Sequence, residues 1–133
     1  MKRTPLKSRS PKGKLIKDIE DLLRAELKEE RGDICEIHNR KCANIGMMHI
    51  LNKRRYPRVR FYKFNLVLAG WFCSHYYTHQ DPDDPRAIYT MKRIAELRGP
   101  DYKEKLLIMD KTAPKLTAFY LTTYLAALQK ELK

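Results

Sequence analysis

The hydrophobic positions near the start of the chain follow a helical period. Apolar side chains recur every three or four residues, at Leu15, Ile16, Ile19, Leu22, Leu23 and Leu27. This spacing gives a helix one apolar face, and Gly32 is typical of a helix end. The sequence therefore predicts a helix over residues 15–32. Residues 1–14 are mostly cations, Ser, Pro and Gly, which predicts a flexible basic arm, either an uninvolved tail or a phosphate-gripping segment.

The hydrophobic pattern changes after Gly32. Residues 45–51 and 64–68 have the short apolar character of two β-strands. Between them lies NKRRYPRVRFYK, a cation-rich connection. The segment from residue 33 to residue 83 is thus expected to hold a small two-stranded ribbon.

Helical patterns return in the last third of the chain. Asp84 and Pro85 suit the cap and the first position of a helix that ends near Gly99, and the residues expected on its apolar face are Ile88, Met91, Ile94 and Ala95. A short helix is predicted after Pro100 and a longer one after Pro114. Their expected faces are Tyr102, Leu106 and Leu107, then Leu116, Phe119, Tyr120, Thr123, Ala127 and Leu128. We predict one α+β domain over residues 15–133, with helices over 84–133.

The chain is strongly basic, with 28 Lys and Arg against 16 Asp and Glu and a formal net charge of +12. Nucleic acid is the partner that such a charge favours, although ribosomal and membrane-surface proteins can be equally basic. No stretch has the roughly 18 to 20 apolar residues of a membrane span, and the N-terminus lacks the apolar segment of a secretory signal. A cytoplasmic protein without a membrane partner is therefore expected.

All metal-ligating Cys and His residues lie in one segment. These are Cys35, His38, Cys42, His49, Cys73, His75 and His79. Cys35 and His38 form a C-x-x-H pair, whose spacing suits two donors on one tetrahedral zinc ion. Cys73 could add a thiolate, and Cys42, His75 or His79 could be the fourth ligand. The alternative is that the three cysteines are reduced thiols in a small core.

A longer motif runs through the same segment. It reads H-I-L-x-x-R-R-Y from His49, R-x-x-x-x-N-L around Asn65, then C-x-H-Y-Y and H-x-D-P. This order resembles the HNH (ββα-metal, or His-Me finger) endonucleases, especially those of phages and mobile elements, over about residues 33–83. The resemblance implies a small ββα-metal core and metal-dependent hydrolysis of phosphodiester bonds in DNA.

The resemblance also implies roles for particular residues. His49 would be the general base that takes a proton from the attacking water, for which a neutral imidazole is suited near pH 7. Asn65 would position His49 or bind the metal, and His75 would bind one divalent ion, Mg²⁺, Mn²⁺ or Ni²⁺. His79, four residues further on, would bind the same ion or a phosphate.

The connection between the two strands carries the expected nucleic-acid contacts. Its cations are Lys53, Arg54, Arg55, Arg58, Arg60 and Lys63. Arginine forks hold phosphate oxygens and release counterions, which gives affinity without sequence readout. Any one of these residues could instead be a solvated surface cation.

Two departures from the family pattern leave alternatives open. Met48 stands where many members have an Asp or His metal ligand, and a thioether is a poor ligand for Mg²⁺ or Mn²⁺. Ser74 interrupts the usual C-x-x-C-H turn. The chain could therefore be a catalytically impaired nucleic-acid-binding protein on an HNH scaffold, or a zinc-stabilised protein-interaction module.

Overall fold

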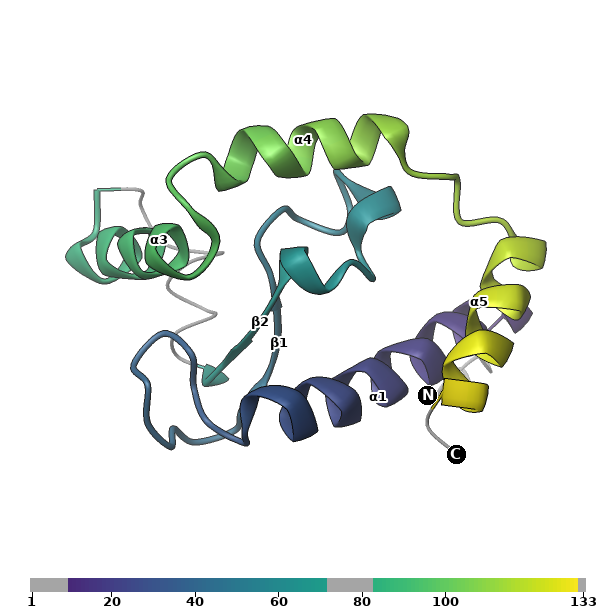
Figure 1. The fold of residues 1–133 in the computed structure, drawn as a ribbon, viewed down its shortest axis with the longest axis horizontal. Helices are drawn as coiled ribbons and strands as arrows, with labels where there is room; N and C mark the ends of the chain where they lie inside the picture. The colour runs from purple at the N-terminus through teal and green to yellow at the C-terminus, as the bar shows by residue number, and fades with distance from the viewer. Residues whose placement is uncertain (1–9, 72–82, 132–133) are drawn as a thin grey trace, which may run out of the picture.

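The computed structural model describes residues 10–71 and 83–131 (Figure 1). The elements follow in the order α1 (Pro11–Arg31), β1 (Gly46–His49), the 3-10 turns η1 (Pro57–Val59) and η2 (Lys63–Asn65), β2 (Leu66–Ala69), α3 (Pro85–Arg98), α4 (Tyr102–Thr112) and α5 (Ala118–Glu131). Helices thus combine with an antiparallel pair of strands, and the predicted α+β class is confirmed.

Strands β1 and β2 form a short antiparallel ribbon close to the two predicted segments. Gly46 pairs with Ala69, and His49 at the other end pairs with Leu66. All residues of β2 are buried, so this strand has an unbroken apolar sequence rather than an alternating one. Both faces of β2 must therefore be covered.

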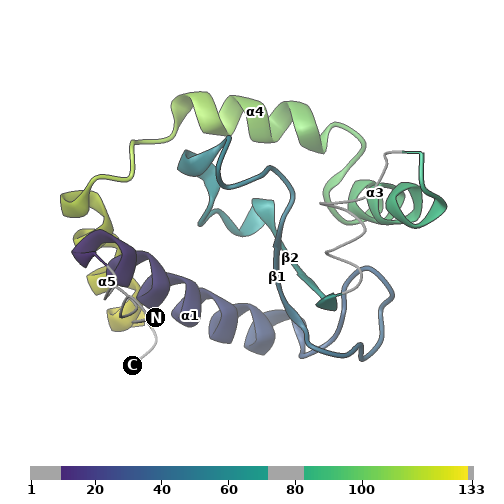
Figure 2. The same cartoon turned by 180° about the vertical axis from the view of Figure 1, so that it is seen from behind.

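The two faces of the ribbon contact different helices. Leu66 and Leu68 pack with residues of α1 and α5 in one hydrophobic cluster. Val67 and Ala69, one position out of phase, pack with Ile94 of α3 and with α4 in a second cluster. Figures 1 and 2 show the ribbon between α4 on one side and α1 on the other. Successive strand residues point to opposite faces, so each face has its own core.

Helix α1 begins earlier than the sequence predicted. Its first residue is Pro11 rather than Leu15, and the Oγ of Ser10 accepts a hydrogen bond from the N–H of Gly13 at 3.1 Å. A serine cap followed by proline at the first position is a favourable helix start, and it outweighs the basic composition of residues 11–14. The predicted arm is therefore wrong for residues 11–14, and residues 1–9 lie outside the described part of the chain.

The remaining helix boundaries agree with the prediction, but two apolar faces do not. Asp84 caps α3 and Gly99 follows its last turn, yet Ile88 is exposed while Ala87 and Thr90 are buried. In α5, Leu121 and Leu128 pack on α1, whereas Phe119 is 82% exposed. The α5 sequence is apolar on several sides, so contact with α1 rather than helical period decides which side is buried. Within residues 10–71 and 83–131, no helix is both long and apolar enough to cross a bilayer.

Candidate metal centre and the surroundings of His49

The chain turns tightly after Cys35. The N–H of Cys35 donates to the carbonyl oxygen of Arg40 at 2.8 Å, and the pair forms an isolated β-bridge. Asn39 adopts a left-handed conformation with φ of 53°, which asparagine tolerates better than most residues. The turn therefore returns the chain so that Cys42 lies near Cys35 and His38.

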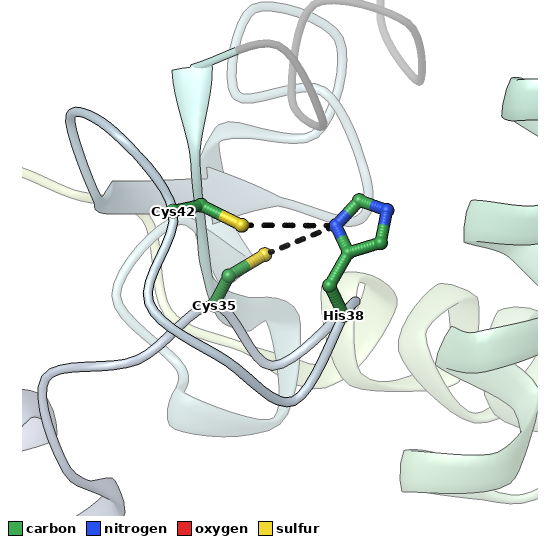
Figure 3. A group of neighbouring side chains, drawn as sticks. All are labelled: Cys35, His38 and Cys42. Carbon is green, nitrogen blue, oxygen red and sulfur yellow. Dashed lines mark hydrogen bonds between the residues drawn. The ribbon is translucent and has the colours of Figure 1, made fainter.

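Cys35, His38 and Cys42 converge on one point (Figure 3). Each sulfur lies 3.8 Å from Nδ1 of His38, and the three donor atoms are all within 4.8 Å of one another. In a tetrahedral site with metal distances of about 2.3 Å to sulfur and 2.0 Å to nitrogen, a sulfur and a nitrogen would be about 3.5 Å apart. This group could hold a metal ion, as the C-x-x-H spacing predicted, with Cys42 as the third donor.

The metal-ligand turn is attached directly to β2. Glu36, between Cys35 and His38, donates its N–H to the carbonyl oxygen of Leu68 at 2.7 Å. Its carboxylate oxygen accepts the N–H of Leu68 at 2.6 Å. The outer edge of β2 is thus hydrogen-bonded to the turn, as a third strand would be.

Two arginines complete this edge, and no pattern in the sequence predicts them. The carbonyl oxygen of Leu66 accepts from Arg31 at 2.6 Å and from Arg98 at 3.0 Å. Arg31 also pairs with Glu36 at 3.1 Å, with little of either side chain exposed. Helices α1 and α3 therefore hold β2 by their C-terminal arginines, which look like ordinary surface cations in the sequence.

A ring contact connects the metal centre to α3. The imidazole of His38 stacks on the ring of Tyr89, with centroids 5.5 Å apart and an interplanar angle of 19°. Both side chains are exposed. An ion bound by His38 would therefore lie beside this part of α3.

His49 is the last residue of β1 and is partly buried. Its Nε2 lies 3.1 Å from the carbonyl oxygen of Arg60. A carbonyl only accepts hydrogen bonds, so this contact requires the proton on Nε2 and leaves Nδ1 as the basic nitrogen. The contact therefore selects one tautomer of the ring.

Burial of the ring, followed by the charges of Lys53 and Arg60, lowers the pKa of His49 from 6.5 to about 4. Glu20 of α1 acts in the opposite direction and pairs with Arg60 at 2.7 Å. His49 is therefore neutral at pH 7 and free to accept a proton, although burial also makes its imidazole a weaker base than that of an ordinary histidine.

Asn65 is fully buried beside the loop that follows β1. Its amide oxygen accepts the N–H of Leu51 at 2.7 Å, and its amide nitrogen donates to the carbonyl oxygens of Leu51 and Val59, each at 3.3 Å. The side chain thus closes the loop over residues 51–59. The side chain of Asn65 therefore bonds the backbone of this loop, and its expected role toward His49 or a metal ion stays a prediction.

Met48 is 2% exposed and lies in the hydrophobic cluster with Val67 and Ile94. It faces the α3 and α4 side of the ribbon, and its neighbour His49 lies on the α1 side next to Glu20 and Arg60. The side chain at position 48 is consequently a core residue.

The cations of the connecting loop divide into two groups. Lys53, Arg54 and Arg55 are exposed. Arg60 and Lys63 instead pair with acidic residues of α1, and Lys63 contacts Glu26 at 2.7 Å and Glu30 at 2.8 Å. The Nη1 of Arg58 lies 3.5 Å from the carbonyl oxygen of Ala113. Of the six cations predicted to contact nucleic acid, Lys53, Arg54 and Arg55 are therefore the ones exposed to a partner.

Three predicted site residues, Cys73, His75 and His79, lie outside the described residues. In the part of the chain that the structure describes, Cys35, His38 and Cys42 are the group of three His, Cys, Asp or Glu side chains that could hold an ion, and His49 belongs to no such group. The catalytic ion site predicted at His75, Asn65 and His79 therefore stays a prediction.

Comparison with known proteins finds no match to the chain among family models, curated proteins or solved structures. The resemblance to HNH endonucleases thus rests on the residues themselves, on the order of His49, Asn65 and His75 and on the basic loop that follows His49.

Proposed function

We propose that this protein is a metal-dependent endonuclease of the HNH type that hydrolyses phosphodiester bonds in DNA. The observation that carries the proposal is the state of His49, a neutral imidazole with its Nε2 proton donated to the carbonyl oxygen of Arg60. In this tautomer Nδ1 carries the lone pair that a general base uses to accept a proton. The loop that follows His49 along the chain carries the exposed cations that would hold DNA.

In the proposed reaction, Nδ1 of His49 accepts a proton from the water that attacks phosphorus. The bond from phosphorus to the leaving oxygen then breaks. The carboxylate of Glu20 and the carbonyl of Arg60 partly offset the burial and the nearby cations that disfavour the imidazolium. Lys53, Arg54 and Arg55 hold the phosphate backbone, and Asn65 keeps their loop closed against β2.

A divalent ion would stabilise negative charge on the phosphate and on the leaving oxygen. The described residues around His49 do not supply its ligands, and two thiolates with an imidazole do not suit Mg²⁺. His75 and His79 are the ligands that the resemblance implies.

We assign zinc to Cys35, His38 and Cys42. Thiolate and imidazole donors suit Zn²⁺, and the turn that carries them is hydrogen-bonded to the edge of β2. A zinc ion there would stabilise the ribbon that ends at His49.

Incubation with supercoiled plasmid and each of Mg²⁺, Mn²⁺ and Ni²⁺ tests the proposal. We expect nicked and linear DNA with at least one ion, none with EDTA, and none from a zinc-loaded sample without an added ion. A protein that binds DNA but cleaves with no ion would contradict the nuclease assignment.

One observation favours a second function, that of a nucleic-acid-binding protein without catalysis. Met48 is buried in the core, so position 48 supplies no metal ligand in this chain. This candidate predicts binding that weakens steeply with salt and no cleavage. Met48→Asp would not restore activity here, because it would bury a carboxylate among apolar side chains.

A further inference from the structure

Gly70 directly follows β2 and is buried against the segment that carries Cys42. A Cβ atom built on Gly70 would lie 2.7 Å from Cβ of Cys42 and 3.2 Å from the carbonyl oxygen of Ala43. Carbon atoms are in optimal contact at about 3.5 to 4.0 Å. Any side chain at position 70 would therefore require these two segments to separate.

The separation could not be absorbed by side-chain rotation. Cβ of Cys42 is fixed to its own backbone, so the chain at Cys42 and Ala43 would have to move. The N–H of Trp71 donates to the carbonyl oxygen of Ala43 at 3.4 Å and holds the same two segments together. A shift of about 1 Å would restore ordinary carbon contacts, but metal-to-ligand distances tolerate only about 0.2 Å.

We propose that Gly70 is the positioning residue of the metal centre. Its missing side chain lets Cys42 lie against the end of β2, and this contact brings the Cys42 sulfur to its position 3.8 Å from His38 (Figure 3). The C-x-x-H pair comes from a local turn, whereas the third donor depends on this contact with β2. The inference depends on metal binding by these three residues and is independent of DNA cleavage.

The ribbon provides a matched control in Gly46. This glycine pairs with Ala69, the residue before Gly70, yet a Cβ built on it meets nothing within 4 Å. Gly70→Ala and Gly46→Ala therefore add the same methyl group at the same end of the ribbon. They differ in whether that group meets Cys42.

The test is titration of the full-length wild type and both variants with Co²⁺, followed by competition with Zn²⁺. Cobalt bound by thiolates gives a sulfur-to-cobalt charge-transfer band and visible d–d bands. We expect Gly70→Ala to bind about 10- to 100-fold more weakly, with reduced charge-transfer intensity. Gly46→Ala should match the wild type. No cobalt binding by the wild type, equal weakening in both variants, or wild-type affinity in Gly70→Ala would overturn the proposal.

If Gly70→Ala fails to fold, a double variant shows whether the contact with Cys42 is the cause. Cys42→Gly removes the Cβ that the new methyl group would meet. Recovery of the folded state in Gly70→Ala/Cys42→Gly, measured by urea unfolding with EDTA present, would support the contact as the cause. Because the carbonyl oxygen of Ala43 would still lie 3.2 Å from the new methyl group, the comparison is with Gly70→Ala, and a double variant no more stable than Gly70→Ala would overturn it.

Discussion

The carbonyl oxygen of Arg60 lies 3.1 Å from Nε2 of His49, and the side chain of the same arginine pairs with Glu20 of α1 at 2.7 Å. One residue therefore joins the end of β1 to helix α1 by both its backbone and its side chain. The ring of His49 is held in one tautomer and kept neutral by burial.

This state of His49 predicts that the protein becomes less stable in mild acid. The unfolded chain binds the proton near pH 6.5 and the folded chain only near pH 4. The contribution of neutral His49 to the free energy of unfolding is fully present above pH 6.5 and decreases as the pH falls toward 4. It should amount to about 2 kcal/mol once solvent screening is considered.

Urea unfolding at pH 7.5 and pH 5, with EDTA present in both, measures the effect. His49→Gln can still donate to Arg60 but does not titrate, so its free energy of unfolding should decrease less on acidification. Parallel decreases in the variant and the wild type would show that His49 is not the group responsible.

The buried amide of Asn65 predicts a large stability effect. Asn65→Ala removes three hydrogen bonds to the backbone of Leu51 and Val59, and of the groups concerned the carbonyl oxygen of Val59 keeps the N–H of Tyr62 at 3.1 Å. The free energy of unfolding should decrease by about 2 to 4 kcal/mol. Asn52→Ala is the control, because this exposed residue makes one local bond to the N–H of Arg54 and should change stability by about 1 kcal/mol or less. Similar decreases in both variants would argue against Asn65 as the residue that closes the loop.

The metal centre predicts that one equivalent of Zn²⁺ binds and raises the thermal unfolding midpoint. Ligand binding to the folded state alone stabilises it by about 2.7 kcal/mol at a free concentration 100 times Kd. Cys42→Ser should weaken binding, whereas His49→Gln, a histidine outside the group, should retain one equivalent. Calorimetric titration and native mass spectrometry measure both. Equal zinc affinity in Cys42→Ser and wild type would show that Cys42 is not a zinc ligand.

The sequence predicted the parts of the fold that depend on local patterns. The helical period ending at Gly32, the Asp84 cap and the two short apolar runs all lie in the expected elements. The C-x-x-H pair likewise predicted two of the three donors that could hold a metal ion, because a tight turn brings Cys35 and His38 together without help from the rest of the chain. Local order of this kind depends on residue spacing alone.

Contacts between distant segments could not be predicted in the same way. Glu36 bonds both polar groups of Leu68, and Arg98 reaches the carbonyl oxygen of Leu66, but neither residue differs from a surface charge in the sequence. The sequence predicts that Lys63 contacts nucleic acid, and it gives no sign that the Nζ of Lys63 pairs with Glu26 of α1. Only the packed structure shows which cations are already neutralised.

Exposed loop cations and loop cations paired with α1 should respond differently to substitution by alanine. Lys53→Ala, Arg54→Ala and Arg55→Ala should each weaken DNA binding and reduce the salt slope by about 1 for each phosphate that the side chain would have neutralised. Arg60→Ala should chiefly reduce stability, because it leaves partly buried Glu20 without its partner.

Fluorescence anisotropy over a salt series and urea unfolding distinguish the two effects. The salt slope could instead be unchanged in all three exposed variants and reduced in a folded Arg60→Ala. That result would show that Arg60, and not the exposed cations, contacts DNA.

Single-turnover cleavage of plasmid DNA by His49→Gln tests the central claim most directly. The comparison uses the divalent ion that best supports the wild type, with exposed Gln129→Ala on α5 as the control. Removal of a general base should lower the rate constant by about 10²- to 10⁴-fold, with DNA affinity and zinc content unchanged and with Gln129→Ala equal to wild type. A His49→Gln protein that cleaves as fast as the wild type would contradict the assignment of His49 as the general base.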